Sequence, residues 1–189
     1  MRLFLAVEPS EAARAQLTAV LADLRRALAD SQSAFRWVPA ENVHITMHFL
    51  GEIDRARADV LVHALAPPLA QPAFDVTTSA AGAFPAAGPP KVLWIGLAEG
   101  APALTTVHAE LGVRLRDAGL PTEARPFSPH LTVARVRDRD RTQAREARRQ
   151  LHLVPCPPIR WRVDRVVLMQ SDLSGATPTY TALAHVGLS

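Results

Sequence analysis

Two short segments of the chain share one pattern: a histidine, an apolar residue, a threonine and a second apolar residue. Residues 44–47 read HITM and residues 130–133 read HLTV, so the two copies begin 86 positions apart (130 − 44). Side chains alternate between the two faces of a strand, so each copy, as a strand, presents its imidazole and its hydroxyl on one face. Two such pairs, related by a pseudo-twofold axis, would face each other and form a four-residue site.

This set of side chains suits in-line displacement at phosphorus. A neutral imidazole can take a proton from an attacking water, and a protonated one can give a proton to the departing oxygen. Histidine serves both roles because its ordinary pKa is about 6.5, so we expect kcat/KM to be bell-shaped around neutral pH. The hydroxyls of Thr46 and Thr132 can donate hydrogen bonds to the phosphate oxygens as negative charge builds up. None of these steps requires a metal ion or a cofactor.

The elements around the two motifs predict an α+β fold. Apolar residues at helical spacing indicate helices over about residues 10–29, 54–65 and 102–118, with Ser10 placed to cap the first and Gly119 to end the last. Strand-like runs cover residues 2–7, 44–51, 74–84, 91–97, 130–134, 159–169 and 179–186. The second half repeats the order of the first. We therefore expect one bilobal domain over residues 1–189, with two similar lobes of antiparallel sheet plus helices around a central cleft.

Composition limits the classes to which the chain can belong. Its 189 residues, 48% of them hydrophobic and 21% charged, can bury a core, which excludes a disordered chain and a multidomain machine. The single cysteine, Cys156, excludes an internal disulfide scaffold and a CxxC metal site. The net charge of +3 supports a nucleic-acid partner only weakly. No apolar run approaches the length of a membrane span, and we expect a cytoplasmic protein with no membrane partner.

The flanks of both motifs resemble a known family. Residues 36–52 (RWVPAENVHITMHFLGE) are similar to the first motif block of the 2H phosphoesterases, and residues 127–135 (FSPHLTVAR) are similar to the second. Within that superfamily the chain resembles the bacterial RNA 2′,3′-cyclic phosphodiesterases, also called 2′-5′ RNA ligases or LigT-like proteins. Residues 2–7, residues 168–171 and Tyr180 extend the resemblance over nearly the whole chain.

The resemblance implies metal-independent hydrolysis of a terminal 2′,3′-cyclic phosphate to a 2′-phosphomonoester. The substrates would be RNA ends or nucleoside 2′,3′-cyclic phosphates. By the same resemblance, His44 would protonate the leaving 3′ oxygen and His130 would activate water. Thr46 and Thr132 would hold the phosphate.

Phe49 and Arg135 are implied by the same resemblance to contact the nucleoside or the phosphate, by stacking and by a charge-assisted hydrogen bond. Each lies five residues after its histidine, so a regular strand would turn it to the opposite face. Either the strand bulges or ends there, or an adjoining turn carries these residues to the site. His48, where the family often has lysine, is expected on the same face as His44 and Thr46. It would help to bind phosphate, or it would be a cleft-edge histidine without an essential role.

Several alternatives stay open at the level of the sequence. The same histidines could perform 2′-5′ ligation, or the motifs could bind RNA phosphate without turnover. A small cyclic nucleotide or ADP-ribose cyclic phosphate could replace the RNA end as the substrate. Residues 135–150, with seven arginines and three acids, are expected to form a loop and a short helix that is either a solvated face or an RNA contact. The histidines at positions 63, 108, 152 and 185 are assigned no role. We expect a monomer.

Overall fold

The computed structural model describes residues 1–122, 125–137, 141–175 and 177–189. The helices in this part of the chain are α1 (Glu11–Ala27), α2 (Arg55–Leu65), α3 (Ala101–Asp117), α4 (Arg141–Leu151) and the 3-10 helices η1 (Ala29–Ala34) and η2 (Ala40–Asn42). The strands are β1 (Arg2–Val7), β2 (Phe35–Trp37), β3 (Ile45–Glu52), β4 (Phe74–Phe84), β5 (Val92–Glu99), β6 (Leu131–Val136), β7 (Arg160–Val163), β8 (Arg165–Asp172) and β9 (Thr179–Gly187).

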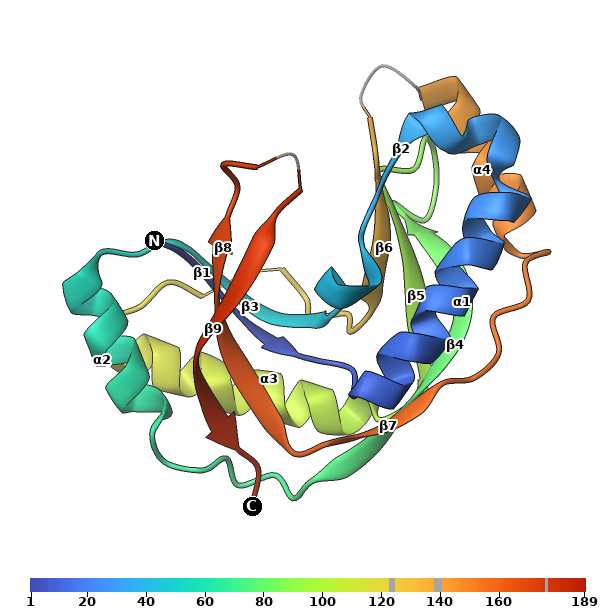
Figure 1. The fold of residues 1–189 in the computed structure, drawn as a ribbon. Coiled ribbons are helices and arrows are strands. Elements are labelled where there is room, and N and C mark those ends of the chain that lie inside the picture. Colours follow the sequence, from blue (N-terminus) through green and yellow to red (C-terminus); the bar gives the residue numbers. More distant parts are fainter. Residues whose placement is uncertain (123–124, 138–140, 176) are drawn as a thin grey trace.

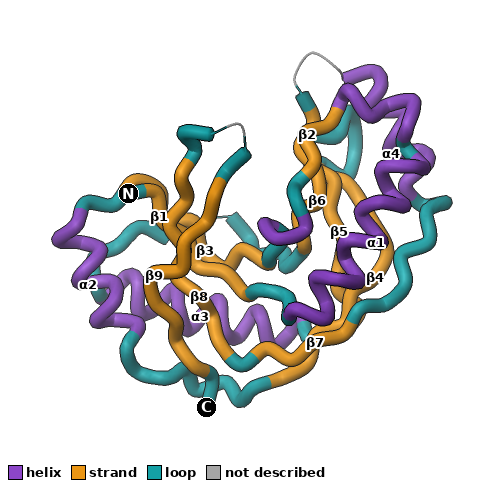
Figure 2. Tube along the Cα trace, viewed as in Figure 1, coloured by secondary structure: helices purple, strands orange, loops and turns teal. Residues whose placement is uncertain are grey.

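The strands form one antiparallel sheet in the order β7-β4-β5-β6-β3-β1-β8-β9, and β2 pairs with β6. The sheet is curled, with α1 and α4 outside one arm and α2 and α3 outside the other (Figures 1 and 2). β3 and β6 stand at the centre of the sheet and pair at Ile45 and Leu131. The predicted α+β fold with two lobes of antiparallel sheet is confirmed, and the two lobes share one continuous sheet.

The two lobes are not the two halves of the sequence, although the repeated order had suggested that they are. One lobe holds β3, β1, β8 and β9, and the other holds β6, β5, β4 and β7. The single strand expected over residues 159–169 is wrong for the same reason. β7 pairs with β4 and β8 pairs with β1, and these partners lie on opposite sides of the sheet centre. The chain therefore ends one strand and begins the next at Asp164.

The predicted caps begin and end the helices as expected. The Ser10 hydroxyl accepts a hydrogen bond from the backbone N–H of Ala13 at 3.2 Å and caps α1. Gly119 follows α3 with a φ of +68°, a left-handed conformation that costs glycine no strain. Leu17 of α1 and Leu111 of α3 are fully buried. These helices thus hold the curled sheet from outside and leave its concave face open.

β3 carries an extra residue shortly after the first motif histidine. Thr46 pairs with Ala6 of β1, and His48 pairs with Leu5, the next residue of β1. Met47 has no counterpart and forms a β-bulge. A bulge exchanges the faces that the following side chains take, so this one decides which residues of β3 reach the cleft.

β6 carries an extra residue at the matching place after the second motif histidine. Thr132 pairs with Trp94 of β5, and Ala134 pairs with Leu93, the next residue along the pairing. Val133 is therefore the bulged residue of this strand. Both bulges fall three positions after the histidine of their motif, so both central strands change face in the same way.

The segment over residues 135–150 follows the expectation in part. β6 extends to Val136, and α4 forms the expected helix, with Ala144 and Ala147 buried and Arg145 and Arg149 exposed. Residues 138–140 of the expected loop lie outside the described residues. The short strand β2 and the helices η1 and η2 were not predicted in the stretch before the first motif. None of the helices in the described ranges has the length and apolar character needed to cross a membrane.

Candidate active site

The two motif histidines are held in the same way. Nδ1 of His44 donates a hydrogen bond to the carbonyl of Asn42, two residues earlier, at 2.8 Å. Nδ1 of His130 donates to the carbonyl of Ser128, again two residues earlier, at 2.7 Å. A carbonyl only accepts, so both neutral rings carry their proton on Nδ1. Nε2 is then the nitrogen of each ring that can take or give a proton.

The histidines flank the point where the two central strands meet. Ile45 and Leu131, which directly follow the two histidines, pair antiparallel. The neighbours of such a pair lie opposite each other, so this register brings each histidine toward the threonine of the other motif. This pairing is compatible with the predicted pseudo-twofold axis, which would pass between Ile45 and Leu131, perpendicular to the sheet.

Aromatic rings support each imidazole from the side. Phe4 stacks on His44 with 4.9 Å between ring centroids, and Tyr180 meets the same ring edge-on at 5.4 Å. Phe84 meets His130 edge-on at 5.1 Å. These rings come from strands distant in sequence from the motifs, and sequence reasoning did not place them in the site. They restrict how far each imidazole can turn.

Burial lowers the pKa of both imidazoles. The pKa of His44 falls from 6.5 to about 4, chiefly because burial disfavours the charged ring. The hydrogen bond to Asn42 opposes this shift, and the positive charges of Arg135 and Arg14 add to it. The pKa of His130 is also lowered, chiefly by burial, with Arg135 adding to the effect. Both rings are neutral at pH 7 in the free protein, which moves the expected bell-shaped profile from neutral pH to the acid side.

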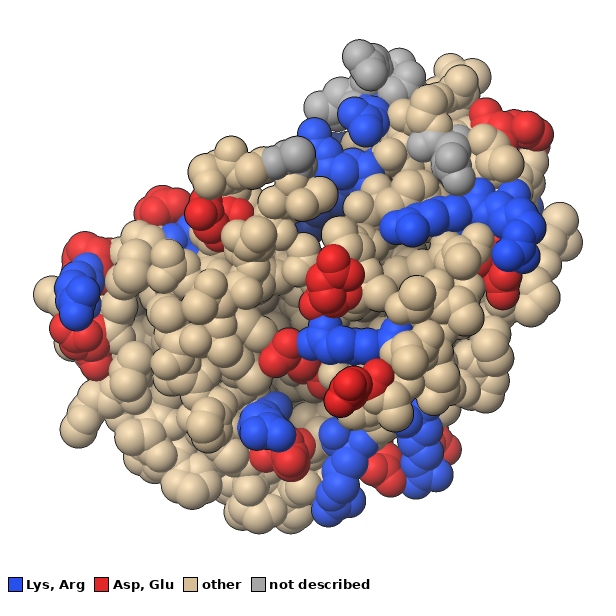
Figure 3. Space-filling view, viewed as in Figure 1, with Lys and Arg blue, Asp and Glu red and all other residues tan. Residues whose placement is uncertain are grey.

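A cleft of about 470 Å³ lies over this junction. Figure 3 shows the hollow between the lobes, with basic side chains gathered inside it. Its lining includes most of the predicted site residues: His44, Thr46, Phe49, Thr132 and Arg135. His130 is not among the lining residues, but the pairing of Ile45 with Leu131 places it opposite Thr46, which lines the cleft. Arg2 and Arg125 bring two further guanidinium groups to the wall.

The bulges explain how Phe49 and Arg135 reach this cleft. Phe49 pairs with Phe4 and is 44% exposed. Arg135 pairs with Arg36 and Val92 and is also exposed. Both side chains lie on the cleft face although their offset from the histidine is odd. Of the alternatives that the sequence left open, a bulge inside a continuing strand is the one found.

The expectation that His48 shares a face with His44 and Thr46 is wrong. The bulge at Met47 turns His48 toward the core, where it is 1% exposed. Its Nε2 donates a hydrogen bond to the carbonyl of His108 in α3, at 2.9 Å. It therefore does not bind phosphate in the cleft.

Arg14 and Asn42 also hold the first motif, and sequence reasoning missed both. Arg14 donates a hydrogen bond to the carbonyl of Glu41 in η2. Asn42, which orients His44 through its own carbonyl, donates through Nδ2 to the carbonyl of Pro178 at 2.7 Å. η2 is thus tied both to α1 and to the segment that leads into β9. One signal was available in the sequence, because a polar residue stands two positions before each motif histidine.

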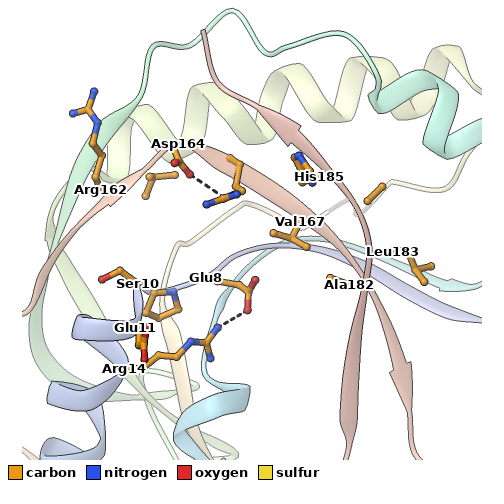
Figure 4. Close-up of a pocket in the computed structure, with 14 residues that line it drawn as sticks. Glu8, Ser10, Glu11, Arg14, Arg162, Asp164, Val167, Ala182, Leu183 and His185 are labelled. Atoms are coloured by element: carbon orange, nitrogen blue, oxygen red, sulfur yellow. Dashed lines mark hydrogen bonds and ion pairs between the residues drawn. The ribbon is translucent and has the colours of Figure 1, made fainter.

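A second depression, of about 550 Å³, lies between the start of α1 and the strands β8 and β9 (Figure 4). Its charged groups are largely paired with one another. Glu8 forms an ion pair with Arg14, and Asp164 forms one with Arg165 at 3.1 Å. No member of either motif lines this depression, so we assign the chemistry to the cleft at the strand junction.

The donor set of the cleft favours acid–base chemistry by histidine. Both motif histidines already use Nδ1 on a backbone carbonyl. Within the described ranges, no three side chains of His, Cys, Asp or Glu gather so that they could hold a metal ion. The groups that converge on the cleft are instead imidazoles, hydroxyls and guanidinium groups, which suit a phosphate ester.

The sequence and the fold are similar to those of known proteins. Residues 9–175 match the family described as the 2′-5′ RNA ligase superfamily. The RNA 2′,3′-cyclic phosphodiesterase of Aquifex aeolicus is 31% identical over 150 residues, which cover 78% of this chain and 79% of the relative. The protein of the same name from Thermotoga maritima is 28% identical over 184 residues, covering 97% and 93%. The crystal structure of E. coli LigT complexed with 3′-AMP matches with a TM-score of 0.72 and 27% identity, over 100% of this chain and 98% of that one.

Proposed function

The chain belongs to the 2′-5′ RNA ligase superfamily, and on this premise we propose that it is a phosphodiesterase that hydrolyses the terminal 2′,3′-cyclic phosphate of RNA to a 2′-phosphomonoester. The observation that carries the proposal is the matched orientation of the two motif imidazoles. Each ring has its Nδ1 engaged by the carbonyl two residues earlier, and each therefore offers Nε2 to a substrate. Two such nitrogens beside one phosphate provide the base and the acid of an in-line displacement.

Water is the nucleophile in this mechanism. His130 takes a proton from the water as the water oxygen forms its bond to phosphorus. The bond from phosphorus to the 3′ oxygen breaks, and His44 gives its Nε2 proton to that oxygen. The 2′ oxygen stays on phosphorus, so the product is a 2′-phosphomonoester with a free 3′-hydroxyl.

The cleft also supplies donors for the charge that builds up on the phosphate. The hydroxyls of Thr46 and Thr132 line the cleft on either side of the strand junction and can donate to the non-bridging oxygens. Arg135 adds a charge-assisted hydrogen bond from the same cleft. Donors fixed on strands need little rearrangement during the reaction, which favours the transition state over the ground state.

The residues at the fifth position after each histidine break the pseudo-twofold symmetry. Phe49 lies on β3, the strand that follows His44, and offers an exposed ring on which a base can stack. Arg135 lies on β6, the strand that follows His130, and offers a positive charge. A nucleoside stacked on Phe49 brings its ribose toward His44, which supports His44 as the acid for the 3′ oxygen.

The lowered pKa values set the pH dependence of the proposed reaction. His44 must be protonated to act as the acid, yet its pKa is about 4 in the free protein. A phosphodiester anion in the cleft raises the pKa of a neighbouring imidazole because it favours the charged form. The kcat/KM profile reports the pKa values of the free protein, so we expect both of its limbs to lie below pH 6.5. The kcat profile reports the complex with substrate, so we expect its limbs to lie at higher pH.

The direct test is hydrolysis of adenosine 2′,3′-cyclic phosphate in excess EDTA. The native protein, His44→Ala, His130→Ala and the exposed control His63→Ala are compared, and the product isomer is identified. We expect only the 2′-phosphate, with activity retained in His63→Ala and reduced at least about a thousandfold in either motif variant. Loss of native activity in EDTA would contradict metal independence. Binding without turnover on both the nucleotide and RNA ends would favour the phosphate-binding alternative.

The name of the matched superfamily supports 2′-5′ RNA ligation as a second activity at the same site. In ligation a 5′-hydroxyl replaces water as the nucleophile, and the same base and acid serve. Incubation of an RNA ending in a cyclic phosphate with an RNA bearing a 5′-hydroxyl tests this directly. A monomer that acts in the cytoplasm is part of the proposal, and gel filtration and cell fractionation check those two points.

A further inference from the structure

Three rings stack beneath the cleft, on the side of the sheet that faces α3. His48 of β3 and His108 of α3 are nearly parallel, with 4.0 Å between ring centroids and 13° between planes. His108 stacks in turn on Phe127, at 4.2 Å and 12°. The hydrogen bond from Nε2 of His48 to the carbonyl of His108 fixes the first ring to the helix.

The stack joins segments that belong to the two different motifs. His48 follows Thr46 by two positions, on the strand of the first motif. Phe127 directly precedes Ser128, whose carbonyl accepts the hydrogen bond from Nδ1 of His130. A displacement of Phe127 would therefore move the carbonyl that sets the orientation of His130.

The local packing allows this close approach of α3 to β3. Gly112 lies one turn after His108 on α3 and is buried against His48. A Cβ atom at Gly112 would lie 3.5 Å from Cε1 of His48 and 3.3 Å from a guanidinium nitrogen of Arg116. The distance to His48 is that of an ordinary van der Waals contact, so α3 packs directly against the His48 ring at this position.

The second motif has no matching stack. Ala134 occupies the position that corresponds to His48, four residues after the motif histidine, and it is fully buried. The three rings therefore form a one-sided connection from the strand of the first motif to the approach of the second. This asymmetry suggests a role beyond filling the core.

We propose that the ring stack of His48, His108 and Phe127 is a positioning element that holds the Ser128 carbonyl, and with it the imidazole of His130, in register with the first motif. The inference rests on the proposed function for its kinetic consequence. Catalytic groups act well only in a narrow range of geometry, and a misplacement of about 1 Å can cost about a hundredfold in rate. None of the three rings touches the substrate in this proposal.

The test uses variants of the two half-buried rings in the full chain. His108→Ala removes the middle ring and keeps the carbonyl that accepts from His48, and Phe127→Leu keeps bulk but removes the aromatic face. We expect kcat on adenosine 2′,3′-cyclic phosphate to fall about tenfold in each, with KM within about twofold. The kcat of the double variant should be only slightly lower than that of the more impaired single variant, because both substitutions break the same stack. His108→Phe, which restores a ring, should recover most of kcat.

A readout without substrate separates this proposal from the proposed function. Side-chain ¹H–¹⁵N NMR of the free protein reports which nitrogen of each imidazole carries the proton. We expect His130 to hold its proton on Nδ1 in the native protein and to show a mixture of tautomers in Phe127→Leu, while His44 stays unchanged. This result would support the positioning role even if the native protein failed to hydrolyse the nucleotide.

An unchanged tautomer of His130 together with an unchanged kcat in both variants would overturn the inference. A lower thermal midpoint beside that result would show that the stack is a packing feature alone. His63→Ala, an exposed histidine on α2, is the matched control and should alter neither readout.

Discussion

Protonation of His44 should destabilise the folded protein as the pH falls. The folded state holds this ring neutral, with a pKa of about 4, whereas the unfolded chain takes up a proton near pH 6.5. Between these values the unfolded state binds more protons, so the free energy of unfolding must rise with pH. The stabilisation is present above pH 6.5 and is lost as the pH falls toward 4.

The size of the effect follows from the two pKa values. Each pKa unit corresponds to about 1.4 kcal/mol, and the two-state expression gives a loss of about 2 kcal/mol between pH 7 and pH 5. His44 is only partly buried by its accessible surface, and solvent screens part of the penalty. We therefore expect a loss of about 1 to 2 kcal/mol from this one group.

Urea unfolding at pH 5, 6 and 7 measures this contribution. His44→Gln cannot take up a proton and can still donate a hydrogen bond to the carbonyl of Asn42. Between pH 7 and pH 5, the free energy of unfolding of the native protein should fall by about 1 to 2 kcal/mol more than that of this variant. His63→Gln, which changes an exposed histidine, should follow the native protein. Equal losses in the native protein and in His44→Gln would refute the lowered pKa of His44 and the acid-shifted rate profile derived from it.

Three further outcomes are expected. Arg135→Gln should raise the pKa of His44 and His130, because the Arg135 charge lowers both, and the kcat/KM profile measured from pH 4 to 9 should move to higher pH. Phe49→Ala should raise KM for adenosine 2′,3′-cyclic phosphate about tenfold, since base stacking contributes about 1 to 3 kcal/mol; an unchanged KM would exclude stacking on this ring. Ser10→Ala should lower the free energy of unfolding by about 1 kcal/mol without changing kcat, because it removes the cap of α1; urea unfolding checks this.

The residues that sequence could identify are those whose chemistry and local pattern coincide. The imidazoles of His44 and His130 recur with matching neighbours, and the helix signals at Ser10 and Gly119 depend only on adjacent residues. These are short-range properties, and the structure places all of them as the pattern indicates. The three aromatic rings that contact the histidines, Phe4, Phe84 and Tyr180, come from other strands, and no spacing along the chain predicts these contacts.

Pairing between distant strands is the part that the sequence could not supply. The run over residues 159–169 reads as one strand because its alternation continues through Asp164. Its two parts pair with β4 and with β1, on opposite sides of the sheet. The interleaving of the lobes follows from these pairings, which depend on where each strand finds a partner and not on its own residues.

The five-residue offset of Phe49 and Arg135 from their histidines connects the local sequence pattern with the pairing of the strands. In a regular strand an odd offset from the histidine points away from the cleft, so a residue that acts in the cleft at that position requires one extra residue in between. Both strands place that residue at the third position, at Met47 and Val133. The same shift sends the fourth position inward, which is why His48 lies against α3. One backbone feature thus brings Phe49 to the cleft and His48 to the ring stack, so a change that removed the bulge at Met47 should disturb both together.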